Sequence, residues 1–171
     1  MRELILGGVR SGKSRLAEQH ANETGLDVMY VATAQVRDAE MQQRIAQHQA
    51  RRPAHWQVIE AGHDLAQVLQ QHAGAGRCVL VDCLTLWLTQ LLCDLSEAEL
   101  HREVDAVLAV LPTLPGQIIL VSNETNMGVV PLGELSRRYC DEAGRLHQQV
   151  GAICERVILT VAGLPLIVKG S

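Results

Sequence analysis

Eight residues near the N-terminus have the types and spacing of a phosphate-binding loop. The run Gly7-Gly8-Val9-Arg10-Ser11-Gly12-Lys13-Ser14 matches the pattern G-x-x-x-x-G-K-[ST]. In such a loop, backbone N–H groups converge on phosphate oxygens, the lysine reaches the β- and γ-phosphates, and the following hydroxyl ligates Mg²⁺. The motif predicts that these eight residues bind a nucleotide, with Lys13 also acting in phosphoryl transfer and Ser14 on the metal.

Phosphoryl transfer on such a loop also needs an acid at the end of a neighbouring strand, to orient Mg²⁺ or its water. Asp82 ends the apolar run 78–81 and is the first candidate. The alternative is that Asp82 only caps the helix that follows. Glu124, after the apolar run 118–121, is a second strand-end acid.

The elements that must position these residues alternate along the chain. Apolar, β-branched runs predict strands, and apolar residues at helical spacing predict helices. The predicted strands are 4–6, 27–33, 56–60, 78–82 and 117–122, with a hairpin formed by 157–161 and 166–169; the predicted helices are 13–23, 38–50, 64–72, 84–93, a segment opened by the capping box Ser96-x-x-Glu99, and 132–154. This order predicts a single α/β domain over 1–171, with three layers around a mainly parallel sheet.

Composition excludes several classes of protein. The 171 residues include 15 Lys and Arg against 19 Asp and Glu, a net charge of −4, which argues against a general nucleic-acid or membrane-surface binder. Hydrophobic residues make up 47% and aromatic residues 2%, so we expect an aliphatic core. Five cysteines without C-x-x-C spacing are expected to be reduced thiols. With no long apolar stretch, we expect a cytoplasmic protein without a membrane span.

Further stretches, spread from the first predicted strand to the last, resemble one enzyme family. They are Tyr30-Val31-Ala32-Thr33, Asp38-x-Glu40-Met41-x-x-Arg44-Ile45-x-x-His48, Arg52-Pro53-x-x-Trp56, Asp82-Cys83-Leu84-Thr85-Leu86-Trp87, Ser122-Asn123-Glu124, Gly128-Val129-Val130-Pro131 and Gly163-x-Pro165 before Lys169. In these blocks and in the phosphate-binding loop, the chain is similar to the bifunctional adenosylcobinamide kinase/adenosylcobinamide-phosphate guanylyltransferase family of cobalamin assembly.

The resemblance implies a P-loop NTPase fold of the RecA-like kind, a homotrimer, and two sequential reactions. The first transfers the γ-phosphoryl group of a nucleoside triphosphate, ATP or GTP, to the aminopropanol hydroxyl of the corrinoid adenosylcobinamide. The second moves GMP from GTP onto that phosphate, through a GMP–histidine intermediate, and releases pyrophosphate and adenosylcobinamide-GDP. Mg²⁺ is the implied cofactor of both steps.

The resemblance also implies roles for particular residues. His48 matches the position of the family's nucleophile, and a neutral imidazole is available for that chemistry at neutral pH. His55 fits the family pattern outside the nucleophile position, and the other histidines carry no such signal. Implied nucleotide contacts beyond the phosphate-binding loop are Thr33, Ala34, Gln35, Gln49, Ala50, Arg51, Arg52, Glu60 and Asp82. Asn126 stands where the family more often has glycine.

Two other interpretations use the same phosphate-binding loop. A kinase-only small-molecule phosphotransferase would share Asp82 and Mg²⁺ but would not be guanylylated on His48. A RecA-like regulatory or assembly ATPase would use the nucleotide to drive partner binding, and would expose an apolar patch for that partner.

Overall fold

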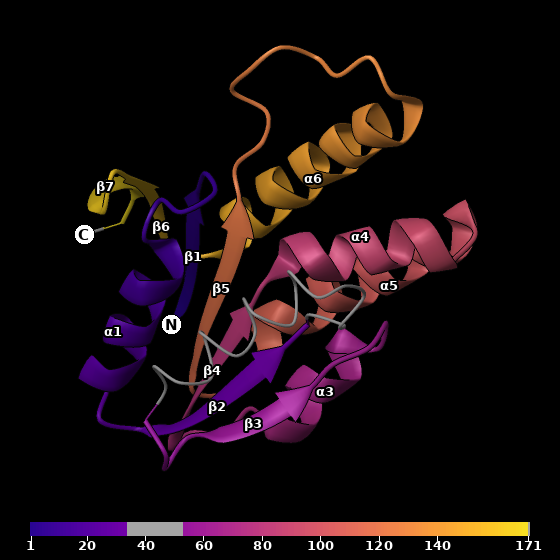
Figure 1. Ribbon diagram of the computed structural model, residues 1–171. Helices are drawn as coiled ribbons and strands as arrows, with labels where there is room; N and C mark the ends of the chain where they lie inside the picture. Colours follow the sequence, from indigo (N-terminus) through magenta and orange to yellow (C-terminus); the bar gives the residue numbers. More distant parts are fainter. Residues whose placement is uncertain (34–52, 171) are drawn as a thin grey trace.

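The computed structural model describes residues 1–33 and 53–170, which form a seven-stranded sheet flanked by helices (Figure 1). The strands are β1 (Arg2–Gly7), β2 (Asp27–Ala32), β3 (Gln57–Glu60), β4 (Arg77–Asp82), β5 (Gln117–Asn123), β6 (Arg156–Val161) and β7 (Leu164–Lys169). Their order across the sheet is β3-β2-β4-β5-β1-β6-β7, and every neighbouring pair is parallel except β6 and β7. The predicted, mainly parallel α/β sheet is confirmed.

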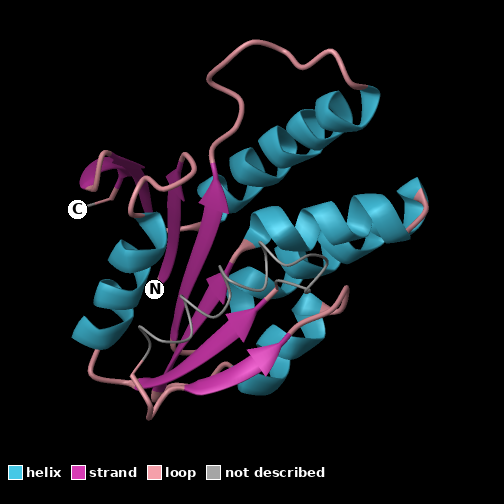
Figure 2. Ribbon diagram, in the orientation of Figure 1, coloured by secondary structure: helices cyan, strands magenta, loops and turns pink. Residues whose placement is uncertain are grey.

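Helices cover both faces of the sheet, which gives the three predicted layers (Figure 2). They are α1 (Lys13–Glu23) on one face, and α3 (Leu65–His72), α4 (Leu84–Asp94), α5 (Glu97–Val110) and α6 (Glu134–Ile153) on the other. A short 3₁₀ helix, Leu111–Thr113, follows α5. The α1 side buries Ile5, Ala17 and Tyr30, while the opposite side forms the larger, aliphatic core around Trp87.

Local signals in the sequence explain where the elements begin and end. The capping box is present: the Ser96 side chain accepts from the Glu99 backbone, and the Glu99 carboxylate accepts from the Ser96 backbone. The hairpin turn between β6 and β7 has positive φ at Ala162 and Gly163, as a two-residue type I′ turn requires. Strand β7 begins two residues earlier than predicted. Helix α6 begins two residues later and ends one residue earlier than the predicted helix 132–154. The predicted helix 38–50 lies outside the described residues.

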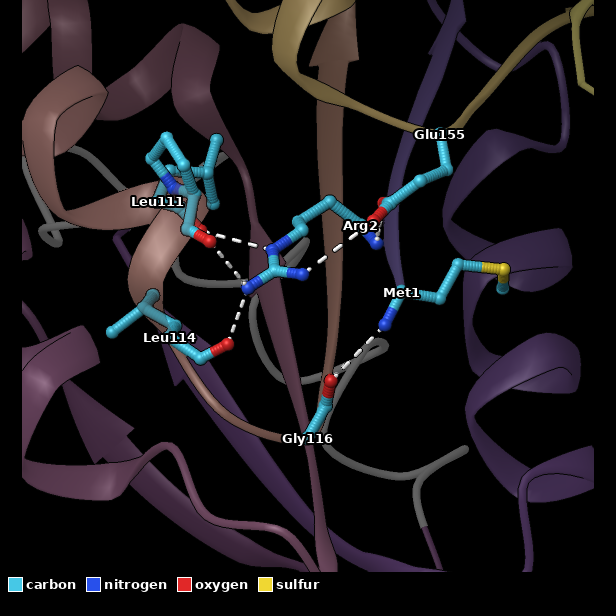
Figure 3. Close-up of polar contacts among 7 residues, drawn as sticks. Met1, Arg2, Leu111, Leu114, Gly116 and Glu155 are labelled. Atoms are coloured by element: carbon cyan, nitrogen blue, oxygen red, sulfur yellow. Dashed lines mark hydrogen bonds and ion pairs between the residues drawn. The ribbon is translucent and has the colours of Figure 1, made fainter.

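A cluster of polar contacts closes the amino end of the sheet (Figure 3). The Met1 ammonium group donates to the carbonyl of Gly116, and the Arg2 guanidinium donates to the carbonyls of Leu111 and Leu114. Arg2 also forms an ion pair with Glu155, with 3.5 Å between Nη1 and Oε1. These contacts join β1 to the segment before β5 and to the segment before β6, its two neighbours in the sheet.

Two further features of the described residues bear on the predictions. All five cysteines are free thiols, as predicted, and Cys78, Cys83 and Cys154 are buried. No helix in the described part of the chain is long and apolar enough to cross a bilayer.

Candidate functional site

The phosphate-binding loop connects β1 to α1 as the motif predicted. Arg10 and Gly12 have φ values of 57° and 96°, and these left-handed conformations turn the backbone N–H groups of the loop inward toward the start of α1. A side chain at residue 7 is excluded, because its Cβ would lie 2.7 Å from the carbonyl oxygen of Thr160. The Ser11 hydroxyl is buried and has no hydrogen-bond partner among the described residues. An unpartnered donor inside a loop of N–H groups fits a phosphate oxygen.

The hairpin turn between β6 and β7 supports this loop from the side. The Gly163 backbone N–H donates to the Ser11 carbonyl at 2.8 Å. A Cβ on Gly12 would lie 3.1 Å from the Gly163 Cα, so the two backbones approach as closely as glycines allow. The C-terminal hairpin therefore fixes the shape of the loop, a role that the sequence pattern did not indicate.

Lys13 begins α1 and Asp82 ends β4, and the two side chains lie close enough for their charges to interact. The Lys13 ammonium donates to the carbonyl of Gly8 at 3.1 Å. Burial lowers the pKa of Lys13, while the charges of Cys83 and Asp82 oppose that shift. A phosphate is the kind of anion that compensates a desolvated ammonium group in such a position.

The Asp82 carboxylate is held from the side of β2. The Tyr30 hydroxyl donates to Asp82 Oδ2 at 3.0 Å, and the Tyr30 ring stacks with Trp56 at 6.4 Å between centroids. Asp82 does not cap the helix that follows. The N-cap of α4 is Cys83, and no side chain makes a capping hydrogen bond there. The capping alternative for Asp82 is therefore wrong.

Thr33 anchors the link between β4 and α4. Its hydroxyl donates to the Cys83 carbonyl at 2.7 Å and accepts from the Cys83 N–H at 2.8 Å, across a cis Asp82–Cys83 peptide bond. The Gln90 side-chain amide donates to the Thr33 carbonyl. The Thr33 side chain thus serves to position Asp82, and the predicted nucleotide contact by this residue stays a prediction.

The donor set fits Mg²⁺ held mainly by substrate. Ser14 lies in the first turn of α1 and Asp82 ends β4, so the pair offers one hydroxyl and one carboxylate oxygen. Within residues 1–33 and 53–170 there is no group of three or more His, Cys, Asp or Glu that could hold a metal by itself. Mg²⁺ in nucleotide sites is usually bound by one or two protein oxygens together with phosphates and water.

Glu60 lies much farther along the same edge of the sheet. It ends β3, opposite Ala32 of β2, and is exposed. Four strand spacings separate β3 from β1, which is about 19 Å at ~4.8 Å per strand. A nucleotide that touches both the loop and Glu60 must lie across the ends of β5, β4 and β2. The predicted contacts Ala34, Gln35, Gln49, Ala50, Arg51 and Arg52 and the predicted nucleophile His48 lie outside the described residues.

The structure places a buried histidine, His147, which the sequence did not indicate, beside the strand-end acid Glu124. Glu124 follows β5 directly, and its backbone N–H donates to the Gly7 carbonyl at 3.0 Å, so this acid borders the phosphate-binding loop. His147 of α6 is buried and faces it, with 4.0 Å between His147 Nδ1 and Glu124 Oε2. The spacing of Ala143, Leu146, His147 and Val150 places this histidine on the buried stripe of α6. That stripe is the signal by which the sequence could have pointed to a buried imidazole.

A mostly apolar pocket of about 330 Å³ opens beside Thr125, the residue after Glu124. The lining residues come from α4, α6 and the loop between β5 and α6: Thr89, Leu92, Cys93, Thr125, Pro131, Leu135, Ser136, Tyr139 and Cys140. In Figure 1 this loop rises from the end of β5 and returns at the start of α6. Asn126 ties it to α6, because its side-chain amide donates to the Cys140 carbonyl at 2.9 Å.

Solved structures share the fold that carries this site. The RadB recombinase matches with a TM-score of 0.53 and 18% identity, over 92% of this chain and 73% of that one. The flagellar accessory protein FlaH from Methanocaldococcus jannaschii matches with a TM-score of 0.52 and 17% identity, over 99% and 78%. At this identity the likeness concerns the P-loop NTPase fold alone.

Comparison of sequences is more specific. Residues 3–168 match the family described as cobinamide kinase / cobinamide phosphate guanyltransferase. The bifunctional adenosylcobalamin biosynthesis protein CobP of Pseudomonas aeruginosa is 64% identical, with 99% of this chain and 98% of that protein covered. The corresponding protein of Escherichia coli, CobU, is 35% identical, with 97% and 98% covered. With its P-loop, strand-end acids and RecA-like sheet in the expected order, this chain belongs to the bifunctional cobinamide kinase/cobinamide phosphate guanylyltransferase family.

Proposed function

We propose that this protein uses the site at the carboxyl end of its sheet for both reactions of its family, and that His48 carries GMP between them. The observation that supports this most strongly is the family match over residues 3–168, because it spans the phosphate-binding loop, Asp82 and the segment that contains His48. Family membership makes the protein a transferase acting on nucleotides and a corrinoid, and excludes a regulatory ATPase as its main activity.

In the kinase step, the loop from Gly7 to Ser14 binds the triphosphate of ATP or GTP, and Lys13 neutralises charge on the β- and γ-phosphates. Mg²⁺, held by Ser14 and, directly or through water, by Asp82, supplies further charge neutralisation when bound. The acceptor hydroxyl oxygen attacks the γ-phosphorus, the bond to the β-phosphate oxygen breaks, and a nucleoside diphosphate leaves.

In the transferase step, an imidazole nitrogen of His48 attacks the α-phosphorus of GTP and pyrophosphate leaves. An oxygen of the corrinoid phosphate then attacks the same phosphorus, and the histidine is released. We assign GTP contacts in this step to Thr33, Ala34, Gln35, Gln49, Ala50, Arg51, Arg52 and Glu60. Arg51 and Arg52 supply positive charge beside a triphosphate.

We also propose that the protein is a homotrimer, in the cytoplasm. The exposed apolar surface supports an oligomer: β7 is exposed along its whole length, including Leu164, Leu166 and Val168, and the loop before α6 exposes Val129 and Leu132. A monomer rarely leaves an apolar edge strand uncovered. Mass measurement in solution by light scattering tests the trimer, and a mass of one chain would overturn it.

The corrinoid is too large for one small pocket, so we place it in a groove between subunits. The pocket beside Thr125 and the apolar loop 127–132 form this chain's side of that groove. A structure of the corrinoid complex with the macrocycle wholly within one subunit would overturn this placement.

The experiment that tests the proposed mechanism is self-labelling. Wild type is incubated with Mg²⁺ and α-³²P-GTP, denatured, and treated with acid or alkali, beside His48→Ala and the matched control His55→Ala, which alters an exposed histidine. We expect an acid-labile, alkali-stable label on wild type and His55→Ala that is absent from His48→Ala, as a phosphoramidate requires. Equal labelling of His48→Ala overturns the role of His48, and a wild type that binds GTP without labelling favours a kinase-only enzyme.

A further inference from the structure

A chain of hydrogen bonds runs from the end of β5 through Thr85 of α4 to His147 of α6, whose ring faces Glu124. The Asn123 N–H donates to Thr85 Oγ1 at 2.7 Å, Thr85 Oγ1 lies 3.3 Å from Ser122 Oγ, and Ser122 Oγ lies 2.8 Å from His147 Nε2. The other ring nitrogen, Nδ1, is buried without a hydrogen-bond partner among the described residues and lies 4.0 Å from Glu124 Oε2.

Either hydroxyl of the Thr85–Ser122 pair can donate to the other, so the tautomer of His147 sets the direction of this chain. We take the Thr85 hydroxyl as donor to Ser122 and the Ser122 hydroxyl as donor to His147 Nε2, because this order directs the remaining ring proton toward the Glu124 carboxylate. His147 Nε2 is then an acceptor, and we assign the proton of the neutral ring to Nδ1, toward Glu124. Burial lowers the pKa of His147, with the Glu124 charge opposing the shift, so burial favours the neutral ring.

Glu124 lies at the carboxyl end of β5, beside the phosphate-binding loop. In the sheet, Asp82 pairs with Val121 and Gly7 pairs with Asn123, so Glu124 lies three residues beyond the level of Asp82 and directly beside the phosphate-binding loop. At ~3.3 Å per residue, Glu124 lies about 10 Å farther along the strand direction than Asp82. One carboxylate oxygen, Oε1, accepts from the Asn126 N–H at 2.7 Å, which fixes the group with Oε2 toward His147.

We propose that Glu124 accepts the proton of the acceptor hydroxyl in the kinase step, and that His147, held by Ser122 and Thr85, is the positioning residue for its carboxylate. As the hydroxyl oxygen forms its bond to the γ-phosphorus, its proton passes to Glu124, the bond to the nucleoside diphosphate breaks, and Glu124 releases the proton to water after the product leaves. The transferase step has no such need, because the attacking corrinoid phosphate is already an anion. The proposal rests on the kinase activity of the family and is independent of His48.

The first test separates the two reactions. Glu124→Gln and the control Glu97→Gln, which alters an exposed acid of α5, are assayed for phosphorylation of adenosylcobinamide and, separately, for guanylyl transfer to adenosylcobinamide phosphate. General-base catalysis contributes about 10²–10⁴-fold, so we expect Glu124→Gln to lose at least ~10²-fold of the kinase kcat. Its KM, its nucleotide affinity and its transferase rate should match those of the control.

Three outcomes overturn the proposal. They are an unchanged kinase kcat in Glu124→Gln, an equal fall of both reactions, and a loss of nucleotide binding. Wild type lacking kinase activity altogether would instead contradict the family assignment, so the two failures are distinguishable. Glu124→Asp is the conservative variant, and partial recovery of kcat relative to Glu124→Gln supports the role of the carboxylate.

The second test uses two amides in place of His147. The side-chain nitrogen of asparagine lies near the position of Nδ1, and the terminal amide of glutamine lies near that of Nε2. Asparagine keeps a donor toward Glu124, whereas glutamine keeps only the contact with Ser122. We expect His147→Gln to lose about tenfold of the kinase kcat, part of the general-base contribution, with KM unchanged, and His147→Asn to lose less. Equal losses, or the reverse order, would show a purely structural histidine and overturn the positioning role.

Discussion

The two ends of the sheet are built on opposite principles. At the amino end, Met1 and Arg2 donate to backbone carbonyls of neighbouring segments and Arg2 pairs with Glu155, as Figure 3 shows. At the carboxyl end, buried polar atoms lack hydrogen-bond partners among the described residues. These atoms belong to Ser11, Gln90, Tyr139, His147 and Thr160. In the described residues, Trp56 and Arg156 contribute the remaining two, and the Arg156 Nε at the amino end of β6 lies 3.4 Å from the Glu3 carboxylate.

This difference indicates where the molecule keeps capacity for ligands. An unpartnered buried polar group costs free energy, and such groups persist where a ligand, a metal or water completes them. Satisfied groups at the other end contribute to stability alone. Variants at the carboxyl end should therefore change activity at little cost in stability, and variants at the amino end should do the opposite.

The largest expected effect is at Lys13. Replacement by methionine removes the charge that faces the phosphates, and loss of one such group typically costs about 10²–10³-fold in kcat. Because burial already lowers the pKa of this ammonium, the folded state disfavours its charge at neutral pH, so its removal should leave the melting temperature unchanged or raise it. Kinase assays and thermal melts measure both effects. A melting temperature lowered by many degrees would contradict the stated difference between the two ends of the sheet.

The next effect is at Glu3, near the amino end of β1. This carboxylate is fully buried and pairs with His20 at 3.0 Å and Arg156 at 3.4 Å. Removing one partner of a buried ionic group typically costs 3–5 kcal/mol, so we expect Glu3→Ala to lose about 3 kcal/mol of unfolding free energy. Denaturant titration measures this loss. Activity below the melting transition should remain, and a stable but inactive Glu3→Ala would break the distinction between the two ends.

A smaller effect of the same kind is expected at Arg2. Its guanidinium is mostly buried and donates to three backbone carbonyls, those of Leu111, Pro112 and Leu114. Hydrogen bonds to a charged group contribute about 1.5–3 kcal/mol, so Arg2→Ala should lose about 2 kcal/mol of unfolding free energy. Arg102→Ala, at an exposed ion pair with Glu103, is the matched control and should change little. Equal effects of the two variants would show that the cluster in Figure 3 adds nothing.

The smallest effect concerns thiol reactivity. Burial raises the pKa of Cys78 and Cys154 to about 12 and that of Cys83 to about 11, so these three thiols are protonated at pH 8. Cys93 is exposed and Cys140 is half-buried in the pocket wall. Titration of the native protein with a disulfide reagent at pH 8 should modify Cys93 first, then Cys140. Mass mapping that finds Cys83 modified as fast as Cys93 would contradict the burial of Cys83 between β4 and α4.

The sequence predicted the features that depend on residues close together in the chain. The phosphate-binding loop, the strand ends at Asp82 and Glu124, the capping box at Ser96 and the hairpin before Lys169 are all local patterns, and the structure confirms each of them as an element. Local patterns suffice because turn residues, caps and apolar periodicity act over a few positions.

Contacts between distant segments escaped prediction. His147 meets Ser122 from 25 residues away, and Thr33 meets Cys83 from 50 residues away. Arg2 finds the carbonyl of Leu111 at a separation of 109 residues. Only the order of strands brings these pairs together, and that order is a property of the whole sheet. The sequence therefore predicted the strand-end acids of the site but not the groups that hold them.

The most direct test of the account is a crystal structure of the protein with Mg²⁺ and a non-hydrolysable GTP analogue. We expect the phosphates in the loop from Gly7 to Ser14, with Lys13 Nζ and Ser11 Oγ on phosphate oxygens. The Glu124 carboxylate should face the γ-phosphorus from the side opposite the β-phosphate. Phosphates bound away from this loop, or a Glu124 carboxylate turned from the γ-phosphate, would contradict it.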